Sequence, residues 1–123
     1  MPKTIISDTS CFIILTNINE LDLLHKVYEQ VTTTTDIANE YGEPLPSWVE
    51  IVSVKDKYRQ QILELQIDKG EASAIALALE TRNSTIILDD HKARKIAEHL
   101  GLVYTGTIGV IVKAKLRGKS KCI

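Results

Sequence analysis

Two apolar segments of the sequence end abruptly on carboxylate side chains. Asp8 follows the run at 3–7, and Asp89 and Asp90 follow the run at 84–88. Both runs are short and rich in β-branched residues, which is typical of strands buried on both faces of a parallel sheet. Residues just beyond the carboxyl ends of such strands line the ligand crevice of open α/β sheets. If the two strands are neighbours, Asp8 meets Asp89 or Asp90 in that crevice.

Helix capping competes with chemistry as an explanation for these acids. An aspartate that precedes a helix commonly caps it by accepting a bond from a backbone N–H. Ser10 stands where it could cap the first helix, which would leave Asp8 free. After the later strand one aspartate suffices as a cap, so the second is surplus. We favour Asp89 as the acid that faces the crevice, without excluding Asp90.

Two glutamates are further candidates. On an ideal helix Glu71 shares a stripe with Ile75 and Leu79, the face expected to pack on the sheet. A first-turn glutamate is favoured by the helix dipole by only about 0.3–1 kcal/mol, which does not explain its place on an apolar stripe. Glu40 lies three residues after Ile37, and inward and solvated positions suit it equally.

Several carboxylates around one crevice indicate a divalent metal ion. They cannot all ionise unaided, because like charges at close range raise one another's pKa. Ligand sets made only of oxygen select hard cations, here Mg²⁺ or Mn²⁺, and such ions most often serve phosphate chemistry. His25, His91 and His99 form no ligand spacing with the cysteines, so zinc is not expected. Asp68 is expected in a solvated loop.

The elements that must position these acids alternate along the chain. Strands are predicted at 3–7, 31–35, 49–54, 84–88 and 102–105, and helices at 11–18, 20–28, 35–42, 57–67, 71–82, 91–100 and 107–118. This alternation predicts an α/β fold, a three-layer α/β/α sandwich with a central, mostly parallel sheet. The Pro-rich break at 43–48 is too short to separate two domains, so we expect a single domain over 1–123.

Composition narrows the class of protein. The 123 residues are 44% hydrophobic and 25% charged, as in ordinary globular domains. The formal net charge of −1 predicts no general attraction to polyanions, so any nucleic-acid surface must be a local patch. We see no signal peptide and no apolar run long enough to span a membrane, and we expect a cytoplasmic protein without a membrane partner. Cys11 is expected to be a buried hydrophobe.

A basic segment, HKARK, follows the aspartate pair. Lys92, Arg94 and Lys95 are expected to face outward, while Ala93, Ile96, Ala97 and Leu100 face inward. These cations could bind RNA phosphates near the acidic crevice, or form an ordinary solvated helix face.

With these features taken together, the chain resembles the PIN-domain nucleases, which include the VapC toxins of toxin–antitoxin pairs. The matching segments are IISDTSCFIILTNI, GEASAIALALE, IILDDHKARKIAEHLGL and GTIGVIVKAK, in family order across nearly the whole chain. The resemblance is closest to bacterial and archaeal members known as predicted nucleic-acid-binding proteins.

The resemblance implies an endoribonuclease that hydrolyses RNA phosphodiesters with Mg²⁺ or Mn²⁺. By matching position it implies catalytic roles for six residues: Asp8, Ser10, Glu40, Glu71, Asp89 and Asp90. Of these, Asp8, Glu71 and Asp89 or Asp90 would bind metal, and Ser10 would orient the first acid or a water. Many toxin-type members carry Asp at the position of Glu71. By analogy we expect a homodimer and an antitoxin partner.

Other acidic α/β domains fit less well. Response-regulator receivers carry paired acids after the first strand, and dehalogenase-type phosphatases carry D-x-D there, whereas Asp8 stands alone. The alternative from another class is a non-catalytic PIN-like module that binds nucleic acid or a partner.

Overall fold

Five parallel strands form the centre of the fold in the computed structural model, which describes residues 3–118. The strands are β1 (Thr4–Ser7), β2 (Val31–Thr34), β3 (Val49–Val52), β4 (Ser84–Ile87) and β5 (Val103–Thr105), in the spatial order β3-β2-β1-β4-β5. β1 therefore lies beside β4, with Ser7 aligned to Ile87. The residues that follow these two strands therefore lie side by side at the carboxyl end of the sheet.

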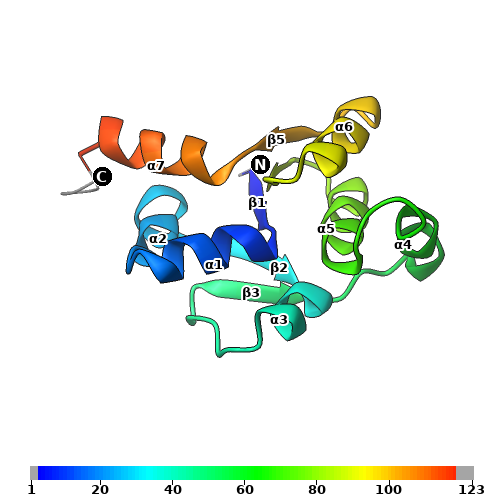
Figure 1. Cartoon of the computed structure of the whole chain (residues 1–123), viewed down its shortest axis with the longest axis horizontal. Helices are drawn as coiled ribbons and strands as arrows, with labels where there is room; N and C mark the ends of the chain where they lie inside the picture. The colour runs from blue at the N-terminus through cyan, green and yellow to red at the C-terminus, as the bar shows by residue number, and fades with distance from the viewer. Residues whose placement is uncertain (1–2, 119–123) are drawn as a thin grey trace.

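Seven helices within the described residues cover both faces of the sheet. They are α1 (Thr9–Asn17), α2 (Asp22–Tyr28), α3 (Thr35–Tyr41), α4 (Lys57–Leu63), α5 (Lys69–Glu80), α6 (His91–His99) and α7 (Thr107–Leu116). In Figure 1, α1, α2 and α7 lie on one side of the sheet and α4, α5 and α6 on the other, with α3 below. The predicted three-layer α/β/α architecture is confirmed, and every strand pair is parallel.

The two central strands are buried because both of their faces carry helices. Ile6, Ile86 and Ile87 are fully buried, and Ile5 nearly so. Each such side chain contributes about 1.5–3 kcal/mol to folding by leaving water. Continuous burial explains why these strands read as apolar runs without alternation.

Helix α5 packs on the sheet with an almost entirely buried surface. Its buried residues are Gly70, Ala72, Ser73, Ala74, Ile75, Ala76, Leu77 and Ala78. The small residues allow close approach to β1, β2 and β4. Ser73 joins the helix to β2 through a 2.6 Å hydrogen bond between its Oγ and Thr34 Oγ1. Helix α5 thus holds its N-terminus at a fixed place near the carboxyl ends of the strands.

Three details differ from the sequence-based expectations. Helix α4 ends at Leu63, before the predicted boundary at 67. Helix α5 begins at Lys69, two residues before the predicted boundary at 71, because Asp68 accepts a 2.8 Å bond from Glu71 N and caps the helix. Leu100 is 43% exposed, because it follows the last turn of α6 and does not share the buried face of Ala93 and Ala97.

Candidate functional site

Asp8 is a buried carboxylate held between two backbone amides. It is 3% exposed, and its Oδ1 accepts a 2.9 Å bond from Cys11 N at the start of α1. Its Oδ2 accepts a 3.2 Å bond from Asp89 N, which lies beyond the end of β4. The expectation that Ser10 caps this helix is therefore wrong: Asp8 is the cap, and Ser10 is exposed. The neighbouring strands β1 and β4 bring Asp8 and Asp89 together as predicted.

A small hollow of about 30 Å³ lies beside Asp8. It is lined by Asp8, Thr9, Ser10, Glu40, Asp68 and Glu71. Such a volume accommodates a water molecule or a similarly small ion. Segments β1–α1, α3 and the start of α5 each supply an acid, so side chains far apart in the sequence share one hollow.

Glu40 lies at the rim of the hollow through a specific contact. Its Oε1 accepts a 2.7 Å bond from Thr9 Oγ1. Gly70 provides the space for this carboxylate, since a Cβ at position 70 would overlap Glu40 Oε1. Glu40 therefore combines the two positions left open by the sequence: it is exposed to solvent, and its carboxylate lines the hollow.

Glu71 and Asp8 both hold protons more tightly than ordinary carboxyl groups. Burial, reinforced by the charges of Asp68 and Asp90, raises the pKa of Glu71 from its ordinary value of 4.5 to about 7. Burial raises the pKa of Asp8 from 3.8 to about 7; the amide of Cys11 opposes this rise, and the charge of Asp89 adds to it. A cation bound among these groups would reverse both shifts.

The two aspartates after β4 have different partners. Asp90 caps α6, with its Oδ2 accepting a 3.0 Å bond from Ala93 N. Asp89 faces Thr107 at the start of α7: its Oδ1 accepts a 2.8 Å bond from Thr107 N, and its Oδ2 a 2.5 Å bond from Thr107 Oγ1. Asp89 is thus the half-buried acid of the pair and Asp90 the exposed one.

Sequence reasoning missed Thr107 and Thr9, and it missed the capping role of Asp68. Thr107 is 1% exposed and holds both oxygens of Asp89. Asp68 is exposed and lies outside the helix, as expected for a solvated loop, but it also caps α5 and lines the hollow. The D-x-x-E spacing of Asp68 and Glu71, which resembles a helix N-terminal capping pattern, could have identified Asp68 as a cap.

The ligand atoms that line the hollow are of the type that a hard divalent cation binds, but they are not arranged to hold one. The lining groups are oxygens only, as Mg²⁺ and Mn²⁺ require, and two of the acids have a pKa raised to about 7. Within residues 3–118, however, no three Asp, Glu, His or Cys side chains converge closely enough to hold a metal ion as they stand. Binding therefore requires side-chain rotation, for which the exposed carboxylates have room.

Two of the three basic residues expected to face outward after the aspartate pair do so, and the third does not. Lys92 and Lys95 are exposed, as expected. Arg94 is half-buried: its Nε donates a 2.6 Å bond to Leu88 O, and its guanidinium lies 5.2 Å from the ring centre of Tyr104. Arg94 is occupied in joining α6 to β4 and β5, because the adjacent glycine at 106 leaves space for its guanidinium.

Fold and hollow together define an α/β domain with an acidic crevice at the carboxyl ends of its central strands. A protein-family model described as a PIN domain matches residues 4–122, and the chain belongs to the PIN-domain family. PIN domains are generally nucleases and typically use divalent metal ions. A comparison with curated proteins found no match.

The structure also bears on membrane insertion. No helix within residues 3–118 is both long enough and apolar enough to cross a bilayer.

Proposed function

We propose that this PIN domain is an Mg²⁺- or Mn²⁺-dependent endoribonuclease. The observation that carries the proposal is the pairing of β1 with β4, which brings Asp89 N onto Asp8 Oδ2 beside the hollow that Glu40 and Glu71 also line. RNA as the substrate rests on the resemblance to toxin-type nucleases.

The acids divide into two proposed roles. Asp8, Glu71 and one of Asp89 and Asp90 would hold the ion, which when bound neutralises phosphate charge and acidifies water. Both aspartates are candidates: the charge of Asp89 raises the pKa of Asp8, the charge of Asp90 raises the pKa of Glu71, and Thr107 fixes the orientation of Asp89.

The remaining groups would orient the reactants. Glu40, whose Oε1 accepts a hydrogen bond from Thr9, would accept a proton from an attacking water. Ser10 lies exposed at the rim of the hollow, where its hydroxyl can donate to a phosphate or a water. Lys92 and Lys95 would attract the RNA backbone, whereas Arg94 would support the fold.

We extend the proposal to a toxin of a toxin–antitoxin pair that acts as a homodimer. Both features rest on the family resemblance. A matching test is expression in a bacterial host: growth arrest that Asp8→Asn relieves supports the toxin role, and normal growth with active enzyme contradicts it.

The nuclease proposal is tested by incubating a mixed RNA pool with the purified protein in Mg²⁺, Mn²⁺ or EDTA. Asp8→Asn should reduce cleavage at least about 100-fold, because it removes a metal-binding charge. Asp22→Asn, the same change on an exposed acid of α2, should cleave like the wild type. Equal cleavage by wild type and Asp8→Asn, or cleavage that persists in EDTA, would contradict the proposal.

A second candidate is a non-catalytic module that binds RNA or a protein partner. It is favoured by the absence, within residues 3–118, of three converged acids and by the engagement of Asp89 with Thr107. If no RNA is cut while Mn²⁺ still raises the melting temperature only when Asp8 is intact, this candidate replaces the nuclease.

A further inference from the structure

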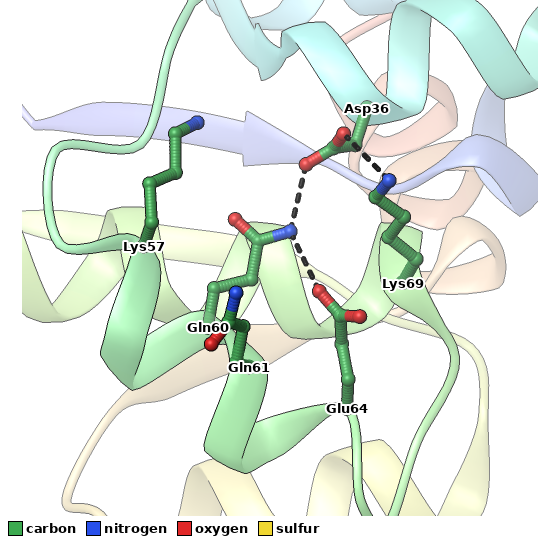
Figure 2. A pocket seen from close by; sticks show the side chains of 6 residues that line it. All are labelled: Asp36, Lys57, Gln60, Gln61, Glu64 and Lys69. Carbon is green, nitrogen blue, oxygen red and sulfur yellow. Dashed lines mark hydrogen bonds and ion pairs between the residues drawn. The ribbon is translucent and has the colours of Figure 1, made fainter.

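A second pocket, of about 330 Å³, lies between α3, α4 and the start of α5. It is lined by Asp36, Lys57, Gln60, Gln61, Glu64 and Lys69, which Figure 2 shows. The volume falls in the lower part of the range of small-ligand sites, about 300–1,000 Å³. None of these residues belongs to the acidic hollow, so the pocket is a separate feature of the same surface.

Gln60 at this pocket has a fixed amide orientation. The side chain is 4% exposed, and its Nε2 donates a 2.7 Å bond to Asp36 Oδ2 and a 3.1 Å bond to Glu64 Oε2. Ionised carboxylates only accept hydrogen bonds, so the reversed amide would face both with an oxygen. The nitrogen must therefore point at the two acids and the oxygen away from them.

The fixed orientation leaves Gln60 Oε1 buried and without a hydrogen-bond partner among the described residues. Figure 2 shows this oxygen turned to the Lys57 side, away from Asp36 and Glu64. Native proteins rarely leave such an acceptor unpaired, because its desolvation is not compensated. As the described side chains stand, none of them donates to Gln60 Oε1, and Lys57 lies on the side to which this oxygen turns (Figure 2).

A further hollow, of about 460 Å³, lies between the Gln60 pocket and the acidic hollow. Asp36 and Lys69 line it together with Glu40 and Asp68. Glu40 and Asp68 in turn line the hollow beside Asp8. The three hollows are therefore neighbours on one surface, so a single strand bound at the acidic hollow would have another of its nucleotides near the Gln60 pocket.

The chemistry of the lining selects the kind of group that fits. Asp36, Glu64 and Gln60 Oε1 form an acceptor-rich side, which disfavours a phosphate or a carboxylate. Lys57 and Lys69 add donors, and Lys69 Nζ lies 3.9 Å from Asp36 Oδ1. Guanine combines adjacent N–H donors on one edge with the O6 and N7 acceptors that lysine commonly binds.

We propose that this pocket binds an unstacked guanine base of a single-stranded RNA substrate, with an N–H of the base donating to Gln60 Oε1. The proposal rests on the nuclease function proposed above. Gln60 Oε1 is buried, so a base reaches it only if neighbouring side chains move; Lys57 and Gln61 line the pocket and are exposed. The site would give the enzyme a preference for guanine at one fixed distance from the cleaved bond.

Binding and cleavage test this proposal separately. In the Asp8→Asn background, fluorescence anisotropy would compare labelled oligouridine six-mers with the same oligomers carrying one guanine at each position. We expect one guanine position to bind about tenfold tighter, as one good base contact does. Gln60→Leu removes the acceptor and should abolish this preference, while Gln66→Leu, the same change at an exposed glutamine, should retain it.

Asp36→Asn provides the matched conservative variant, since Gln60→Leu leaves two acids unpartnered and its folding must be checked by its melting temperature. The Oδ1 of an asparagine at 36 can still accept from Gln60 Nε2, and Glu64 Oε2 still holds the same amide nitrogen, so the free acceptor stays in place. The guanine preference should therefore be retained in this variant. An oligomer series without guanine preference, or a preference that survives in a folded Gln60→Leu protein, would overturn the proposal.

The two proposals fail in different ways. Absence of cleavage with an intact guanine preference would overturn hydrolysis and keep the pocket. Cleavage at all four bases alike, unchanged by Gln60→Leu, would overturn the pocket and keep hydrolysis.

Discussion

Asp8 combines a structural role with an unusual acidity. Asp8 caps α1 and holds the end of β4, yet burial raises its pKa to about 7. A cap alone would be better placed in solvent, where a carboxylate remains ionised without cost. The burial of Asp8 beside Glu71 is what distinguishes this carboxylate from an ordinary capping residue.

Thr107 is the residue that the structure adds to the site. Its hydroxyl donates to Asp89 Oδ2 and its N–H to Asp89 Oδ1, so it fixes the orientation of that acid. Residues that orient metal-site acids in this way are positioning residues, since they need not touch the substrate.

We predict that Thr107→Val lowers cleavage about 10–100-fold, as loss of such an orienting bond commonly does. Thr107→Ser keeps the hydroxyl and should restore cleavage. The measurement is the cleavage rate across a Mn²⁺ titration, in which Val should need more Mn²⁺ for half-maximal rate. A lower melting temperature with an unchanged Mn²⁺ dependence would mean that Thr107 supports only the fold.

At the scale of elements, the close approach of α3 to α5 sets the position of Glu40. Gly70 lies in the first turn of α5, where it permits Glu40 Oε1 to meet Thr9 Oγ1. The glycine of the GEASAIALALE segment therefore serves packing against a neighbouring helix and not a chain break.

Gly70→Ala should separate stability from activity. Alanine favours a helix over glycine by up to about 1 kcal/mol, but its Cβ displaces Glu40 and breaks a hydrogen bond worth about 0.5–1.5 kcal/mol. We expect the free energy of unfolding, measured by urea denaturation, to change by less than about 1 kcal/mol while cleavage falls clearly. In a Glu40→Ala background the same change should be more stabilising; equal effects in both backgrounds would exclude contact with Glu40 as the cause.

At the scale of the whole molecule, the raised pKa values of Asp8 and Glu71 link stability to pH. Both groups bind protons more tightly in the folded than in the unfolded protein, with pKa values of about 7 against 3.8 and 4.5. Their contribution to stability is therefore complete below about pH 4 and is lost as the pH rises to about 7. A divalent cation should compensate for this loss at neutral pH.

We expect the melting temperature of the wild type to fall relative to that of Asp8→Asn between pH 5 and pH 8. The variant lacks the ionising group at position 8. Both proteins share all the other carboxylates, so the effect of those groups is removed when the two melting temperatures are subtracted. Mn²⁺ should raise the wild-type melting temperature at pH 8 and have little effect at pH 5. A constant difference between the two proteins across this range would contradict the burial of an ionisable Asp8.

The sequence by itself determined the order of strands and helices and the acids that end β1 and β4. Runs such as Ile86-Ile87-Leu88 can be recognised as buried strands from the sequence, because burial on both faces of a strand requires continuous apolar residues. The helices predicted at 35–42 and 91–100 end at or directly before a glycine, and Gly42 and Gly101 both have positive φ angles.

Only the tertiary structure decided which partner each carboxylate meets. Asp8 binds the amide of Asp89, Asp89 binds Thr107, and Gln60 lies between Asp36 and Glu64. Residue spacing reports the periodicity of a single helix or strand, whereas most of these partners belong to different elements. Their contacts depend on which strands and helices become neighbours when the chain folds, and the sequence pattern of one element does not contain that information.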